Sequence, residues 1–261
     1  MADKIAWLCL GAMGGPMAGH LAGAGHQVTV YNRTRERADA WVSEHGGRSA
    51  DTPAAAAAGA RFVFVCSGND DDLRAVALGE GGAFEALDRG AVFVDHTTVS
   101  ADLARELDRA ANERGARFLD APVSGGEEGA RRGALTIMAG GEAAAFERVQ
   151  PVWACYARQA TLLGPAGSGQ LAKMVNQICI AGVLQGLSEG LAFAERAGLD
   201  PARVVEVISK GAAGSWQMDH RAETMAARRF DFGFAVDWMR KDLAIALAEA
   251  ERNGARLPVA Q

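Results

Sequence analysis

The sequence predicts an α/β fold in two parts: a doubly wound parallel sheet in residues 1–164, then an all-helical region in residues 165–261, joined by a long helix. Short apolar segments alternate with helical segments through the first part, which is the pattern of strand–helix–strand units. After Gly164 and Pro165 these runs stop. Residues 169–196 contain no proline, so a single helix of roughly 40 Å is expected there.

The expected strands are mostly continuous apolar runs, which indicates strands that are covered on both faces. They are residues 5–10, 28–31, 61–66, 91–95, 117–121, 135–139 and 160–163. Helices are expected between them at residues 34–45 and 101–114, with Ser100 as the N-cap of the second, and a short alanine-rich helix at residues 54–58.

The C-terminal region carries two further helical patterns, at residues 201–208 and 239–253. Asp200 before Pro201 is the sequence of an N-cap followed by a proline at the first helical position. A group of aromatic residues precedes the last helix, and we expect most of it to pack in the domain core, because large aromatic side chains dominate cores. Its members are Phe230, Phe232, Phe234 and Trp238.

Composition narrows the class of protein. The chain has 261 residues, of which 49% are hydrophobic, enough for one large or two modest domains. Its net charge of −5 argues against general nucleic-acid binding. The four cysteines form no CxxC pair, which fits a reducing cytoplasm and neither a disulfide framework nor a metal site. We expect no signal peptide and no apolar run that approaches the ~20 residues of a membrane span.

A glycine-rich turn follows the first expected strand. Gly11, Ala12, Met13 and Gly14 lead from that strand into a helix, and such turns let backbone N–H groups and a helix N-terminus approach a pyrophosphate. Gly11 and Gly14 fill the second and third glycine positions of the G-x-G-x-x-G pattern, whereas Cys9 occupies the first. The pattern predicts a Rossmann dinucleotide site whose turn geometry or affinity can suffer from Cys9.

The end of the second expected strand bears on the choice of dinucleotide. NAD sites usually place an acidic residue here, on the ribose 2′-hydroxyl. This chain has Asn32, Arg33 and Thr34 instead, with Arg37 one helical turn further on. Arg33 can stack on adenine and pair with a 2′-phosphate, so NADP(H) is favoured over NAD(H). The alternative is that Arg33 and Arg37 are solvated surface cations.

Polar groups follow two later strands, where ligands bind in open α/β sheets. Thr98 and His96 come after the fourth strand, and Ser124, Gly125 and Gly126 after the fifth. A hydroxyl beside exposed backbone N–H groups suits a carboxylate, although each segment taken singly fits an ordinary loop equally well. His96 has no carboxylate partner in its sequence neighbourhood, so we expect it to be structural or to line the cofactor.

The start of the long helix places a lysine and an asparagine three residues apart. Lys173 and Asn176 therefore share a helix face and can reach one cavity. The alternative is a solvated pair, since lysine is mostly exposed.

Five motifs follow one another along the chain, and through them the sequence resembles the β-hydroxyacid dehydrogenase family over nearly its whole length. They are residues 10–18, 95–98, 120–126, 167–176 and 241–243. The resemblance implies that Lys173 is the catalytic general acid and base and that Asn176 helps orient the substrate. It also implies that Ser124, Gly125 and Gly126 hold the substrate carboxylate and that Thr98 lies near the nicotinamide ribose.

The resemblance also assigns roles in the helical region. Lys241 is expected to approach the substrate and the cofactor. Residues 211–218 are expected to form a pocket wall, in which Trp216 either shapes the substrate cavity or packs in a core. Relatives assemble through this region, so a homodimer or homotetramer is expected. Three departures stand out: Cys9, His20 where the family often has asparagine, and an end at Gln261 where relatives usually continue for another helix or so.

Together these features predict a cytoplasmic, NADP-dependent oxidoreductase that moves a hydride between nicotinamide and a small β-hydroxyacid or its semialdehyde. The favoured activity is semialdehyde or glyoxylate reduction. The alternatives are an NAD-dependent dehydrogenase of 3-hydroxyisobutyrate, serine or 3-hydroxypropionate, and a non-catalytic nucleotide-binding module. Related imine reductases lack the lysine, so Lys173 argues against that activity.

Overall fold

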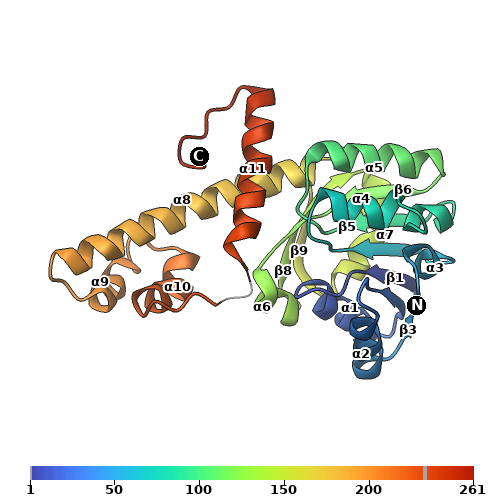
Figure 1. Ribbon diagram of the computed structural model, residues 1–261, viewed down its shortest axis with the longest axis horizontal. Coiled ribbons are helices and arrows are strands. Elements are labelled where there is room, and N and C mark those ends of the chain that lie inside the picture. The colour runs from blue at the N-terminus through green and yellow to red at the C-terminus, as the bar shows by residue number, and fades with distance from the viewer. Residues whose placement is uncertain (1, 232–233) are drawn as a thin grey trace. The chain divides into compact units, whose positions relative to one another are not determined.

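A computed structural model describes residues 2–231 and 234–261 of the chain. The chain divides into two compact units, Met1–Lys173 and Met174–Gln261. The predicted fold class is confirmed: a mainly parallel sheet with helices precedes an all-helical region, and the long helix α8 (Ser168–Arg196) begins in the first unit and continues into the second (Figure 1).

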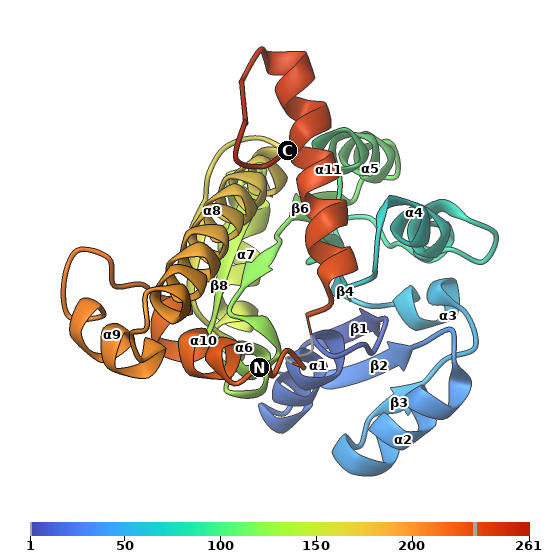
Figure 2. The same cartoon turned by 60° about the vertical axis from the view of Figure 1, so that its left-hand side comes forward.

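The strands of the first unit form a sheet in the order β3-β2-β1-β4-β5-β6-β8-β7, with β9 beside β8. They are β1 (Lys4–Leu8), β2 (Gln27–Tyr31), β3 (Arg48–Ser49), β4 (Phe62–Val65), β5 (Val92–Asp95), β6 (Arg117–Asp120), β7 (Val123–Ser124), β8 (Leu135–Gly141) and β9 (Ala157–Leu162). From β3 to β6 all pairs are parallel, and Figure 2 shows β1, β2 and β3 side by side. Beyond β6 the sheet is mixed, because β8 runs antiparallel to β6 and β7.

Helices cover both faces of this sheet. They are α1 (Gly14–Gly23), α2 (Arg35–His45), α3 (Pro53–Ala57), α4 (Asp70–Leu78), the 3-10 helix η1 (Ala83–Ala86), α5 (Ala101–Glu113), α6 (Gly126–Arg131) and α7 (Ala143–Trp153). Successive strand residues alternate between two cores: Trp7 and Phe64 pack with residues of α1, α2 and α7, while Leu8 and Val65 pack with residues of α3, α4 and α5. Continuous apolar strands are therefore buried on both sides, as predicted.

The first strand ends two residues earlier than expected, at Leu8. Cys9 adopts a φ of 73°, the left-handed region, which breaks the extended backbone. This conformation costs a non-glycine residue about 1–2 kcal/mol. The first glycine position of the turn is therefore filled by a strained cysteine, and the turn still forms.

Every regular element that the structure describes in the second unit is a helix. This unit contains the rest of α8, α9 (Pro201–Ile208), α10 (Trp216–Ala226) and α11 (Val236–Asn253), and its small core joins Leu187 and Leu191 to Met218 and Ala222. The sequence did not predict α10. Ser215 starts it as an N-cap, since its side chain accepts a hydrogen bond from the N–H of Met218.

The expectation about apolar runs needs correction. Helix α8 is long and apolar enough to cross a membrane by length and composition alone, with a mean hydropathy of 1.3 over its most apolar window. Polar residues such as Lys173 and Asn176 are dispersed along the helix, so the sequence shows no uninterrupted apolar run of this length. It is weak evidence of a membrane span, because the core helices of soluble proteins pass the same test.

Candidate active site

The glycine-rich turn has the geometry of a dinucleotide cradle. A Cβ atom on Gly14 would overlap the carbonyl oxygen of Cys9, so only glycine lets α1 start this close to β1. A Cβ atom on Gly11 would meet no described atom within 4 Å, so the backbone there is open. These are the roles of the third and second glycines of the pattern: close helix–strand packing and close approach of the backbone to a pyrophosphate. The residues present fit a nicotinamide dinucleotide.

Asn32 holds this turn to the end of β2. Its Oδ1 accepts a hydrogen bond of 2.9 Å from the N–H of Leu10, and its Nδ2 donates one of 2.9 Å to the carbonyl of Thr34. Both ends of the amide are thus used within the protein. Asn32 was predicted to bind the cofactor, and the structure adds a role in fixing the two segments beside it.

Arg33 and Thr34 are exposed beyond the same strand. The guanidinium Nη1 of Arg33 lies 3.4 Å from Oδ1 of Asp72 on α4, with 88% of the arginine side chain exposed. Thr34 is the N-cap residue of α2, but its side chain makes no capping hydrogen bond within the described chain. The predicted arginine is therefore accessible to an anion, although it already has an acidic neighbour.

The thiol of Cys9 lies beneath this region. Burial raises its pKa to about 12, with a further increase from the negative charge of Asp72 and a decrease from Arg33. Cys9 is therefore a neutral thiol at physiological pH, and it adds no charge to the pyrophosphate site.

The loop after β5 is held from two sides. Its Thr97 hydroxyl accepts a hydrogen bond of 2.9 Å from the N–H of Ser67, after β4. The buried side chain of Gln170, in the first turn of α8, donates to the carbonyl of Thr97 at 2.7 Å and accepts from the N–H of Val99 at 3.1 Å. Thr98, the predicted neighbour of the nicotinamide ribose, lies between these two anchored peptide groups. Gln170 was not predicted as a site residue.

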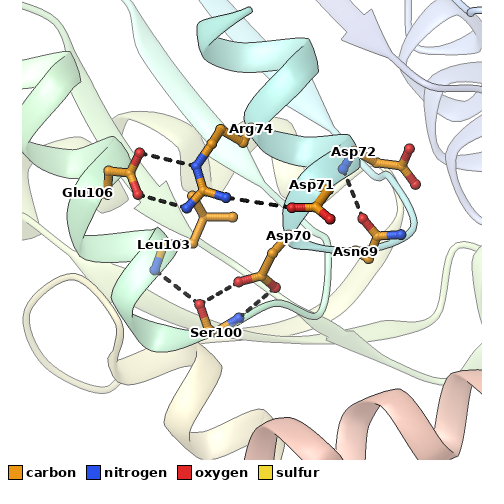
Figure 3. A network of polar contacts seen from close by, with 8 residues as sticks. All are labelled: Asn69, Asp70, Asp71, Asp72, Arg74, Ser100, Leu103 and Glu106. Carbon is orange, nitrogen blue, oxygen red and sulfur yellow. Dashed lines mark hydrogen bonds and ion pairs between the residues drawn. The ribbon is translucent and has the colours of Figure 1, made fainter.

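Helix α4 is tied to the same loop (Figure 3). Asp70 accepts hydrogen bonds from the N–H and the hydroxyl of Ser100, at 3.1 and 2.5 Å, and the Ser100 hydroxyl caps α5 through the N–H of Leu103. Ser100 is thus the predicted N-cap. One helical turn further on, Arg74 pairs with Glu106 at 2.9 Å. These contacts fix the start of α4 against the start of α5.

Two buried carboxyl groups end neighbouring strands. Asp95 on β5 pairs in register with Asp120 on β6. Oδ1 of Asp95 accepts from the N–H of Thr97 at 2.8 Å, but Oδ2 has no hydrogen-bond partner among the described residues. Burial raises the pKa of Asp95 to about 8, against the hydrogen bonds from Thr97, which lower it. Asp95 is therefore largely a neutral acid at pH 7.

His96 is structural, in agreement with the sequence interpretation. It is 2% exposed, its Nδ1 lies 2.5 Å from the carbonyl oxygen of Ala121, and its Nε2 lies 2.8 Å from the hydroxyl of Tyr156. Burial lowers its pKa to about 4, so the ring is neutral, with Nδ1 donating and Nε2 accepting. Both nitrogens are used within the core and neither is available as a general base.

Asp120 anchors the start of α8. Its Oδ1 accepts from the N–H of Gly167 at 2.8 Å and its Oδ2 from the N–H of Gln170 at 2.9 Å. A carboxylate at a helix N-terminus satisfies donors that have no partner inside the helix. Lys173 follows Gln170 by three residues, on the same helix face, and is 8% exposed. The solvated alternative for Lys173 is therefore wrong.

The segment predicted to hold a carboxylate lies on an edge of the same unit. Ser124 ends β7 and pairs with Thr136 of β8, while Gly125 and Gly126 are exposed, with φ values of 136° and 63°. Only glycine adopts both conformations readily. The Nε2 atom of His20 lies 3.0 Å from the carbonyl of Ala130, so α1 holds the short helix that follows this segment.

The second unit contains the other predicted residues. Nδ2 of Asn176 donates to Oε1 of the buried Gln177 at 2.8 Å, and Nε2 of Gln177 donates to Oδ2 of the buried Asp242 at 2.6 Å. Nζ of Lys241 lies 3.2 Å from Oδ1 of Asp242. Gln177 and Asp242 therefore connect Asn176 with Lys241, a link that local sequence patterns do not show.

The large aromatic residues that the structure describes in this unit are not core residues. Trp216 is 52% exposed and stacks on His220 at 4.3 Å, so it is not a core tryptophan. The expected core packing of the aromatic group at residues 230–238 is not observed, since its described members are exposed. These are Phe230 (67%), Phe234 (51%) and Trp238 (42%), whereas Phe232 lies outside the described residues.

Each of the two units matches known protein families. A family model described as the NAD binding domain of 6-phosphogluconate dehydrogenase matches residues 4–164, and one described as NAD-binding of NADP-dependent 3-hydroxyisobutyrate dehydrogenase matches residues 167–261. An uncharacterized oxidoreductase of Shewanella frigidimarina is 62% identical over 98% of this chain and 88% of its own length. The 2-hydroxy-3-oxopropionate reductase of Escherichia coli is 38% identical over 98% and 87%.

Solved structures lead to the same conclusion. A 3-hydroxyisobutyrate dehydrogenase of Mycobacterium tuberculosis, solved with L-serine, superimposes with a TM-score of 0.89 and 30% identity, over 100% of this chain and 90% of that one. The glycine-rich cradle and these matches define an NAD(P)-dependent oxidoreductase that acts on hydroxyl groups. Within that class, the chain belongs to the β-hydroxyacid dehydrogenase family.

Proposed function

We propose that the protein reduces a small semialdehyde or glyoxylate with NADPH, with Lys173 as the general acid. The observation that carries this proposal is the burial of Lys173 one helical turn after Gln170, the side chain that binds the Thr97–Val99 loop. Asp120 and Gln170 hold this turn of α8 at the carboxyl ends of β5 and β6. That edge is where open α/β sheets bind their ligands.

The chemistry needs little from the protein beyond orientation and one proton. When bound, the nicotinamide supplies or accepts the hydride. In reduction Lys173 donates a proton to the substrate oxygen as negative charge develops there, and in oxidation it accepts that proton. Ser124 and the exposed backbone of Gly125 and Gly126 bind the substrate carboxylate, and Asn176 helps orient the substrate. Lys241 and Trp216 also bind the substrate, and Lys241 contacts the cofactor.

Preference for NADP(H) rests on the residues after β2. The strand ends without a carboxylate for a ribose 2′-hydroxyl, Arg33 is exposed, and Thr34 keeps its hydroxyl out of helix capping within the described chain. The description of the matching C-terminal family model as NADP-dependent supports the same preference.

We further propose a cytoplasmic homodimer or homotetramer with no nucleic-acid or membrane partner. The cysteines of the described chain are free thiols, as a reducing compartment favours. Large apolar side chains of the second unit are exposed, Phe193 by 72% and Val207 by 73%, which is typical of surfaces that associate. Light scattering tests the assembly, and a monomer at working concentration contradicts it.

The decisive experiment follows nicotinamide absorbance with NADPH and NADH on glyoxylate and on succinic, tartronate and methylmalonate semialdehydes. L-Serine and 3-hydroxyisobutyrate with NAD⁺ test the alternative dehydrogenase.

Lys173→Ala should lower kcat by about 100- to 10,000-fold while NADPH still binds, because acid–base catalysis contributes that much. Lys210→Ala, at an exposed lysine two residues after α9, is the matched control. Undiminished turnover in Lys173→Ala contradicts the assignment, and NADPH binding without turnover on any substrate favours a non-catalytic module.

A further inference from the structure

The ion pair between Arg33 and Asp72 spans the crevice of the Rossmann fold. Arg33 follows β2 and Asp72 lies in the first turn of α4, after β4. These two strands flank β1, the strand that leads into the glycine-rich turn. The strand order reverses between β1 and β4, and a dinucleotide binds at that switch point. Nη1 of Arg33 nevertheless reaches Oδ1 of Asp72 at 3.4 Å.

The pair also lies near the turn itself. Among the charges that act on the thiol of Cys9, Asp72 raises its pKa and Arg33 lowers it, after the larger effect of burial. Both charges are therefore close to the first residue of the turn. In the proposed function, Arg33 binds the 2′-substituent of the adenosine ribose. That substituent is therefore exposed to the electric field of both Arg33 and Asp72.

The backbone that carries Asp72 is fixed. Its N–H donates to Oδ1 of Asn69 at 2.8 Å, which caps α4, and Asp70 is held by Ser100 (Figure 3). The side chain of Asp71, by contrast, is 99% exposed and approaches Arg74 at 3.9 Å. Of these two neighbouring carboxylates, Asp72 faces Arg33, whereas Asp71 interacts with Arg74.

We propose that Asp72 is a second determinant of cofactor choice, opposing the 2′-phosphate that Arg33 attracts. This inference rests on the proposed binding of the dinucleotide at the glycine-rich turn. A 2′-phosphate within reach of Arg33 approaches the Asp72 carboxylate and is repelled by it, whereas a ribose 2′-hydroxyl carries no charge. Asp72 thus reduces the preference for NADPH over NADH that Arg33 alone would confer. An exposed pair has little binding energy of its own, so the repulsion dominates.

The test measures dissociation constants for NADPH and NADH by fluorescence titration of the reduced cofactor, at low and high salt. Asp72→Asn should increase the NADPH-to-NADH affinity ratio by about threefold at low salt, with less effect at high salt. Asp72→Glu keeps the charge and should leave the ratio near that of the wild type. Asp71→Asn, one residue away, is the matched control and should also leave it unchanged.

An unchanged or lower ratio in Asp72→Asn, with a folded protein by circular dichroism, overturns the inference. An equal rise in Asp71→Asn does so too, because it would show a general charge effect. The proposed function is judged separately: wild-type preference for NADPH and turnover decide it, while the change in ratio between variants decides the role of Asp72. A wild-type protein that prefers NADH would contradict the NADP proposal and leave the measured shift to test Asp72.

Discussion

Gln170 and Thr97 are joined by a hydrogen bond of 2.7 Å between the side-chain amide and a main-chain carbonyl, although they lie 73 residues apart. The other end of the same amide binds the N–H of Val99. One buried side chain thus links the loop that carries Thr98 to the helix turn that precedes Lys173. The predicted cofactor contact and the proposed catalytic lysine are positioned by a shared residue.

Replacement of Gln170 by methionine should affect both stability and catalysis. Methionine has a similar volume but leaves the buried N–H of Val99 and carbonyl of Thr97 without their partner, at a cost of about 2–4 kcal/mol in the free energy of unfolding. Urea unfolding measures this loss. In the folded variant we expect kcat to fall more than the affinity for semialdehyde. Gln185→Met, at an exposed position on α8, is the control, and an equal effect there would contradict the role of Gln170.

The two glycines of the turn should respond differently to alanine. Gly14→Ala forces a methyl group against the carbonyl of Cys9, and such overpacking typically costs 1–3 kcal/mol, so we expect a lower melting temperature. Gly11→Ala adds a methyl group in open space, so stability should be retained while NADPH affinity falls. Thermal unfolding and cofactor titration separate the two effects. Unchanged affinity in Gly11→Ala would show that the pyrophosphate does not approach Gly11.

Asp95 should make the protein less stable as pH rises. The folded state retains its proton up to a pH of about 8, whereas the ordinary value is 3.8, so between these values the folded state binds more protons than the unfolded chain. The free energy of unfolding therefore decreases across this window. Asp95→Asn removes this titration while keeping an acceptor for the N–H of Thr97. Its melting temperature relative to the wild type should increase from pH 4 to pH 8, and a constant difference would contradict the raised pKa.

The arrangement of the sheet was predictable because both of its faces are buried. Runs such as residues 62–65 carry no polar residue, and this pattern distinguishes a covered strand from an edge strand. The two-residue strands β3 and β7 are too short to give a pattern. The antiparallel direction of β8 depends on its partners and not on its own residues. The early end of β1 depends on the left-handed Cys9, which sequence patterns indicate only when the residue is glycine.

Residues of the site were predictable where a local sequence pattern indicates them. Gly11, Gly14 and the N-cap Ser100 belong to this group. Gln170 and Asp72 were missed because their partners are distant in sequence, at Thr97 and Arg33. A single glutamine in the first turn of a helix is typical of a solvated helix start. The same holds for one of three consecutive aspartates. Their roles depend on tertiary contacts that no local pattern contains.

The thiol of Cys9 has a consequence for the chemical durability of the turn. Alkylating reagents and peroxides attack thiolates, and a thiol with a pKa of about 12 supplies almost none at neutral pH. A free cysteine, with a pKa of about 8.5, is far more vulnerable. The sulfur atom in the turn is therefore kept in its least reactive form by its surroundings, and a position that glycine usually occupies carries a side chain resistant to oxidative damage.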